Sequence, residues 1–151
     1  MASLKLDNIL SYLGSFVKNT TKEIEDIKSL KENRVLWSND ELTDKIWYPG
    51  EKAALNLSET VSSQKNGVIL VWSRYEDGEP KNWGWIHSFI PKWQVKNYDG
   101  TGINCPLTGY SKCGGSIYKY LYLYDDKLTG HTQNYTDEYA KKFVIRAVLG
   151  V

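Results

Sequence analysis

GVILVWSRYEDGEPKNWGWIHSFIPK, residues 67–92, holds two runs of strand-forming residues on either side of a turn. Residues 68–75 are β-branched, apolar or aromatic except for Ser73 and Arg74, a pattern typical of a strand buried on both faces. Asp77-Gly78 supplies the positive φ that a reversal needs, and Pro80 has no N–H for a central ladder. We therefore expect the chain to turn back after this first strand.

A second strand is predicted over residues 83–90. Alternation along it places four bulky rings on one face, Trp83, Trp85, His87 and Phe89. The two strands together predict the central hairpin of a β-domain.

Shorter β-like runs flank this hairpin on both sides. They lie at residues 35–37, 46–48, 52–57, 128–131 and 143–151, with turn-forming residues between them. IYKYLYLY, residues 117–124, alternates cleanly, with Ile117, Lys119, Leu121 and Leu123 on one face and four tyrosines on the other. Residues 97–116 hold five glycines and are expected to be irregular.

The spacing of these runs, without βαβ alternation, predicts a mainly β fold. We expect an antiparallel β-sandwich or barrel-like domain over residues 34–151, preceded by an N-terminal helical segment, residues 1–33.

The N-terminal segment has heptad spacing. Steps of three and four separate Leu6, Ile9, Leu13, Phe16, Thr20, Glu23, Ile27 and Leu30, and six of these eight residues are apolar. Thr20 and Glu23 fit a capping box, so a break near Asn19 is an alternative to one continuous helix. A helix packed on its own domain, a coiled coil joining copies of the chain, and a helix docked on another protein all fit this stripe. The six apolar residues are the candidate oligomerisation contacts.

Composition excludes several classes of function. The formal net charge of +1 argues against a nucleic-acid or anionic-membrane partner. No run reaches the roughly 18 apolar residues of a membrane span, and the first residues lack a secretory signal pattern, so we expect synthesis in the cytoplasm. Cys105 and Cys113 are expected to be reduced and structural, with a loop-closing disulfide or a metal site as alternatives.

Catalytic and metal motifs find little support. There is no Gly-x-Ser-x-Gly elbow, and His87 and His131 lie far apart without ligand spacing. Gly100-x-Gly102 lacks the Gly-Lys-Ser/Thr of a phosphate loop. We expect no catalytic residues, no metal and no cofactor, and hence a protein that is not an enzyme.

Tyrosine and tryptophan, whose rings carry a hydrogen-bonding group, are the stronger candidates for ligand contacts. The chain has eleven Tyr and six Trp but three Phe, a bias that favours contact surfaces. Rings of this kind stack on sugar faces, so the candidate ligand contacts are Trp83, Trp85, Tyr118, Tyr120, Tyr122 and Tyr124. Burial of these rings under a second sheet or a neighbouring subunit is the alternative.

Four stretches together resemble a known family. ILVWSRY (69–75), GWIHSFIPK (84–92), YKYLYLYDDKLTGH (118–131) and FVIRAVLGV (143–151) resemble tail-associated modules in baseplate, tail-fibre and minor structural proteins of phages that infect Gram-positive bacteria. The resemblance covers about the last 90 residues and leaves the N-terminal helix outside.

This resemblance implies a non-enzymatic component of a virion tail tip or baseplate, assembled in the host cytoplasm and acting in assembly or host-surface recognition. The implied partners are other phage tail proteins and host cell-wall polysaccharide, with a homotrimer or a monomer both open. A carbohydrate-binding module for wall glycan or teichoic acid and a cell-wall hydrolase are the alternatives.

Overall fold

The computed structural model describes residues 2–31, 34–39, 54–107 and 117–151. The chain divides into two compact units, Met1–Asn33 and Arg34–Val151, and each is described by itself. The expected strand at residues 46–48, part of the run 52–57, and Cys113 lie outside the described residues.

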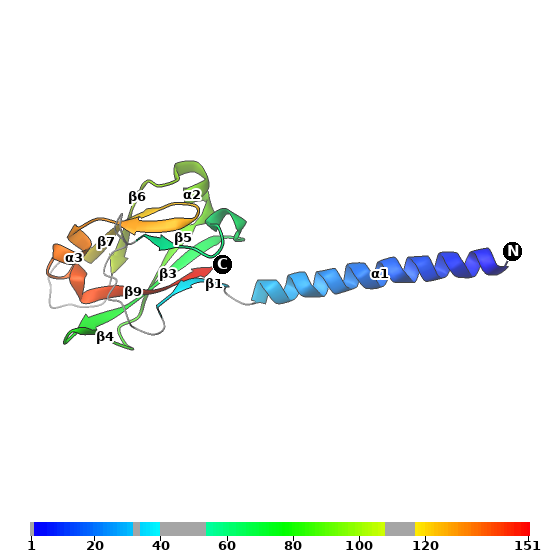
Figure 1. Cartoon of the computed structure of the whole chain (residues 1–151), viewed down its shortest axis with the longest axis horizontal. Coiled ribbons are helices and arrows are strands. Elements are labelled where there is room, and N and C mark those ends of the chain that lie inside the picture. The colour runs from blue at the N-terminus through cyan, green and yellow to red at the C-terminus, as the bar shows by residue number, and fades with distance from the viewer. Residues whose placement is uncertain (1, 32–33, 40–53, 108–116) are drawn as a thin grey trace. The chain divides into compact units, whose positions relative to one another are not determined.

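The second unit is mainly β and antiparallel, as the sequence predicts (Figure 1). One sheet, in the part of the chain that the structure describes, consists of β1 (Arg34–Ser38), β9 (Phe143–Gly150), β3 (Gly67–Glu76), β4 (Glu79–Pro80) and β5 (Ile86–Pro91). The other consists of β2 (Leu55–Asn56), β8 (Lys127–Gly130), β7 (Ile117–Leu123) and β6 (Gly102–Leu107).

The core lies between these two sheets. One cluster of buried side chains includes Leu70, Trp72 and Val148 from the first sheet and Leu121 and Leu128 from the second. Alternating residues from two inner faces fill one core, which is the packing of a β-sandwich. Trp72 is fully buried there.

Strand β3 organises the first sheet. It pairs with β9 on one edge and with β5 and the short β4 on the other, and its burial on both faces confirms the prediction for residues 68–75. Asp77 (φ 55°) and Gly78 (φ 83°) both adopt positive φ at the turn into β4, as a tight hairpin turn requires. The last strand, β9, lies between β1 and β3.

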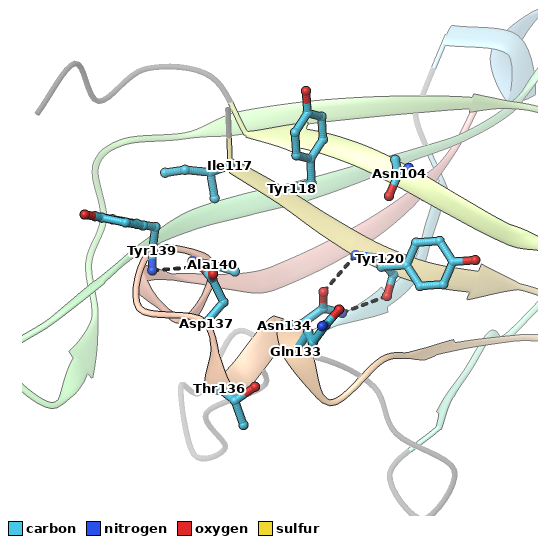
Figure 2. Close-up of a pocket in the computed structure, with 10 residues that line it drawn as sticks. All are labelled: Asn104, Ile117, Tyr118, Tyr120, Gln133, Asn134, Thr136, Asp137, Tyr139 and Ala140. Carbon is cyan, nitrogen blue, oxygen red and sulfur yellow. Dashed lines mark hydrogen bonds between the residues drawn. The ribbon is translucent and has the colours of Figure 1, made fainter. Parts of the chain in front are cut away.

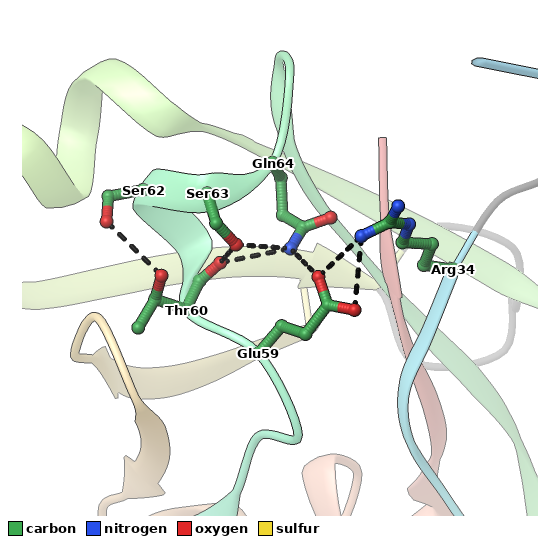
Figure 3. A network of polar contacts seen from close by, with 6 residues as sticks. All are labelled: Arg34, Glu59, Thr60, Ser62, Ser63 and Gln64. Atoms are coloured by element: carbon green, nitrogen blue, oxygen red, sulfur yellow. Dashed lines mark hydrogen bonds and ion pairs between the residues drawn. The ribbon is translucent and has the colours of Figure 1, made fainter. Parts of the chain in front are cut away.

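A polar network holds the start of β1 against the segment before β3 (Figure 3). Arg34 Nη1 lies 2.8 Å from Glu59 Oε2, and Nε2 of the buried Gln64 donates to Ser63 Oγ at 2.9 Å and to the Thr60 carbonyl at 3.0 Å. Hydrogen bonds from Arg34 and Gln64 lower the pKa of Glu59. Because Arg34 and Glu59 are exposed, the satisfied amide of Gln64 contributes more to local order than their ion pair.

Two local expectations for the β-domain are wrong. Residues 83–85 precede β5 because Gly84, at φ 66°, leaves the extended conformation. The region expected to be irregular contains the end of α2 (Lys92–Tyr98) and all of β6, which pairs with β7 from Gly102 onward. Pairing of β6 with β7, the next strand that the structure describes, compensates for the glycine-rich composition.

The first unit is one continuous helix, α1 (Ala2–Lys31). The expected alternative of a break near Asn19 is therefore wrong. Thr20 Oγ1 donates to the Phe16 carbonyl at 2.9 Å, which is a mid-helix bond instead of a cap. None of the helices that the structure describes combines the length and apolar character needed to span a membrane.

Candidate functional site

A pocket of about 560 Å³ opens where the ladder between β7 and β8 stops. The register ends at Leu121 opposite Gly130, and the chain then turns into the short helix α3 (Gln133–Thr136) and the 3-10 turn η4 (Ala140–Lys142). Figure 2 shows the residues that line the pocket, Asn104, Ile117, Tyr118, Tyr120, Gln133, Asn134, Thr136, Asp137, Tyr139 and Ala140.

Strand β7 supplies the aromatic wall. Its burial alternates, with Lys119, Leu121 and Leu123 buried while Tyr118 and Tyr120 are 48% and 37% exposed. This confirms the predicted alternation of the IYKYLYLY run. Cross-strand pairing with Tyr120 brings Asn104 of β6 into the same wall, and Asn104 is exposed.

Asn134 fastens α3 to the open edge of β7. Its Nδ2 donates to the Tyr120 carbonyl at 2.8 Å, and its Oδ1 accepts from the Tyr120 N–H at 2.7 Å. The Tyr120 carbonyl also accepts from the His131 N–H at 3.1 Å. The side-chain amide therefore satisfies the Tyr120 N–H and adds a second bond to this carbonyl where the ladder ends. Asn134 is 2% exposed, so this contact is a fixed part of the pocket wall.

Asp137 is held in place at the other wall. Its Oδ1 accepts from the Tyr139 N–H at 3.0 Å and the Ala140 N–H at 2.8 Å. These two bonds do not use its second oxygen, Oδ2. A carboxylate oriented in this way can accept hydrogen bonds from a ligand.

A buried lysine supports α3 from the core side. Lys119 is fully buried, and its Nζ donates to the Asn134 carbonyl at 3.0 Å and lies 6.0 Å from the Trp72 ring centre. Burial lowers the pKa of Lys119 to about 7, and the charge of Asp137 opposes this shift. The amine is therefore near its midpoint at neutral pH.

The pocket combines flat rings with hydrogen-bonding groups at its rim. Tyr118 and Tyr120 offer exposed rings, while Asn104, Gln133 and Asp137 offer amide and carboxylate groups. Such a set can stack on a ring with an apolar face and bond to its substituents. Of the described residues that line the pocket, Asp137 is the one carboxylate, whereas glycoside hydrolysis ordinarily uses a pair.

The other candidate ligand contacts lie elsewhere. Tyr122 is half-buried with its ring 5.3 Å from that of Tyr120, and the half-buried Tyr124 lies 4.9 Å from Lys127 Nζ. Trp83 and Trp85 are exposed in the segment before β5, beside the other sheet.

Trp85 is held by polar contacts of its own. Its ring centre lies 5.0 Å from the guanidinium carbon of Arg146, and its Nε1 donates to the Asn82 carbonyl at 3.2 Å. The structure thus places two of the six candidate rings in the pocket and separates the tryptophans from them.

Sequence reasoning missed the polar part of the site. Asn104 falls in the segment expected to be irregular, and Gln133, Asn134 and Asp137 fall in a polar stretch for which the sequence predicted no element. The register of β6 on β7 and the return of α3 bring them together. The one feature of the sequence that could have indicated these residues is the long polar stretch after the tyrosine run.

The apolar stripe of α1 is exposed in its described part. Leu6, Ile9, Leu13 and Phe16 are between 50% and 60% exposed. The side chains of Ile27 and Leu30 lie outside the described residues.

The described residues form no cluster of His, Cys, Asp or Glu that could hold a metal ion. Cys105 is a free, buried thiol, and burial raises its pKa to about 11. Comparison with protein-family models, with curated proteins and with solved structures finds no match to this chain.

Proposed function

We propose that the protein is a non-enzymatic, carbohydrate-binding component of a phage tail tip or baseplate that contacts the host cell wall. The pocket beside β7 carries this proposal, because it sets two exposed tyrosine rings next to amide and carboxylate groups. The four family-like stretches support the assignment to a phage tail.

Sugars suit this arrangement for a physical reason. One face of a pyranose ring carries C–H groups and stacks on an aromatic ring, while its hydroxyls need donors and acceptors at the edge. Tyr118 and Tyr120 meet the first need, and Asn104 and Asp137 meet the second. With a single lining carboxylate among the described residues, we propose binding without cleavage.

Calorimetric titration of the full chain with polysaccharide released from Gram-positive cell walls tests the sugar site. Tyr118→Ala is expected to weaken binding roughly tenfold, which corresponds to about 1.4 kcal/mol of lost contact. Tyr98→Ala is the matched control, since Tyr98 is 51% exposed against 48% for Tyr118 and lies outside the pocket lining.

In the same titration, the Asn104→Ala variant is expected to bind more weakly than the wild type. The Tyr98→Ala control is expected to bind with the wild-type affinity. No binding by the wild-type chain, or equal affinities for the Tyr118 and Tyr98 variants, would contradict a sugar site in this pocket.

The tail assignment has a separate test. Peptides of the chain are expected in mass spectra of virions purified from the phage that encodes it. Their absence from virions, while the chain is present in the lysate, would refute the assignment and leave the sugar site to be judged by titration.

A further inference from the structure

Helix α1 carries a wide apolar surface. Its 30 residues correspond to a rod of about 45 Å at the usual helical rise. Seven large apolar side chains in the described part are between 47% and 60% exposed, Leu6, Ile9, Leu10, Leu13, Phe16, Val17 and Ile24.

These side chains share one side of the helix. At about 100° per residue, they occupy an arc of roughly 120° together with Thr20. Asp7, Ser11, Lys18, Lys22 and Glu25 fall on the opposite side. The continuity of α1 through Asn19 keeps the arc in one line.

The arc contains a seam without charge. Steps of four and three separate Leu6, Leu10, Leu13, Val17, Thr20 and Ile24. This register places Glu23 beside the seam, whereas the stripe expected from the sequence placed Glu23 within it. Knobs-into-holes packing between copies requires such a heptad seam.

Charge argues against a membrane as the partner of this face. Over residues 5–25, three lysines (Lys5, Lys18 and Lys22) balance three acids (Asp7, Glu23 and Glu25). Helices that lie on membranes are usually rich in Lys and Arg on the polar face. A charge-balanced polar face with a heptad seam fits association with the same helix of another copy.

The width of the arc argues for more than two copies. Ile9 and Phe16 lie next to the seam and extend it to three apolar positions in the first two heptads, whereas the same position holds Glu23 in the third. A two-stranded coiled coil buries a narrower stripe of two positions and leaves such flanking residues in water, whereas a bundle covers them. Closed symmetry of three equivalent copies makes the helices parallel.

We propose that three copies of α1 associate in parallel and in register through the seam of Leu6, Leu10, Leu13, Val17, Thr20 and Ile24, with Ile9 and Phe16 covered at its flanks. The assembly carries three copies of the β-domain, and weak binding sites on them then act together on a polymeric ligand. The self-association stands whether or not the pocket binds sugar.

Light scattering of the full chain at tens of micromolar tests the proposal. The wild type is expected at three times the chain mass of 17.3 kDa. Val17→Lys, in the seam, is expected to give monomers, while Ser11→Lys, on the opposite side, stays trimeric. Tryptophan fluorescence monitors folding independently, because all six tryptophans lie after residue 33.

A monomeric or dimeric wild type overturns the three-helix arrangement, and so does a Val17→Lys variant that remains trimeric. Vesicles containing anionic lipid provide the second arm. A monomeric wild type that sediments with the vesicles, and loses this binding in Val17→Lys, would assign the face to membranes. The paired replacement Ile9→Gln and Phe16→Gln is expected to lower the mass, and an unchanged trimer would refute the role of the flanks.

Discussion

Replacing Lys119 by Met removes an amine from the core and is expected to change how stability depends on pH. Lys119 is fully buried with Nζ 3.0 Å from the Asn134 carbonyl, and burial lowers its pKa from 10.5 to about 7. Met has a similar length and no charge, so the variant keeps most of the packing.

The sign follows from the protons bound by each state. Between pH 7 and 10.5 the unfolded chain keeps the Lys119 proton while the folded protein has released it. Stability therefore rises with pH in this window. The stability gained in this way is lost as the pH falls from 10.5 toward 7. Below pH 7 the stability no longer changes through this group, because Lys119 is protonated in both states.

The magnitude follows from the same shift. Each pH unit inside the window changes the free energy of unfolding by up to about 1.4 kcal/mol. Because the folded amine is half titrated at about pH 7, the step from about pH 7 to about pH 9 amounts to about 2 kcal/mol. Over this step in pH, the free energy of unfolding of the wild type is expected to rise by this amount relative to that of Lys119→Met.

Urea unfolding followed by tryptophan fluorescence measures the difference at the two pH values and at equal protein concentration. Losing the bond to Asn134 costs the variant roughly 1 kcal/mol at either pH, so it cancels from the change. Lys96→Met, on an exposed lysine, is the matched control for the loss of a lysine. A difference between wild type and Lys119→Met that stays constant, or shrinks as the pH rises, would refute the reasoning.

Three other outcomes are expected. Asn134→Ala leaves the Tyr120 N–H without its bond at 2.7 Å, while the Tyr120 carbonyl loses one bond at 2.8 Å and keeps the one from the His131 N–H at 3.1 Å. The free energy of unfolding in urea should therefore fall by roughly 1 to 3 kcal/mol; a loss below about 0.5 kcal/mol, which is the effect of a surface change, would show that α3 is not held this way. Gly78→Ala, at φ 83° with open space around it, should lower the melting temperature, whereas Gly14→Ala in the helix should raise or preserve it; equal shifts would contradict the backbone argument. Cys105, buried with a pKa of about 11, should resist alkylation at neutral pH until urea unfolds the chain, and rapid labelling of its tryptic peptide in the native protein would show that it is accessible.

Local pattern was enough to predict the strands that carry their own signal. The apolar run of residues 68–75 forms β3, and the alternation from Ile117 onward forms β7 with its tyrosines outward. Burial on two faces and burial on one face each impose a distinct period on the sequence, and neither depends on which strand is the neighbour.

Backbone conformation limited the same reasoning at Gly84. A glycine fits an extended strand and a positive φ equally well, so the pattern of rings around it predicted a strand where the chain turns. The helix α2 and the strand β6 were missed for a related reason, because their stability comes from packing of Val95 and pairing with β7 and not from composition.

The sequence by itself determined the mainly β class, the helical N-terminal segment and the placement of the tyrosines on one face of their strand, since these depend on the period of apolar residues along one segment. The tertiary structure alone decided the pocket, because Asn104, Tyr118 and Asp137 come from three separate segments. They meet through the register of β6 on β7 and through the bonds of Asn134 to Tyr120. Contacts between distant segments have no period in the sequence, so the site follows from the fold.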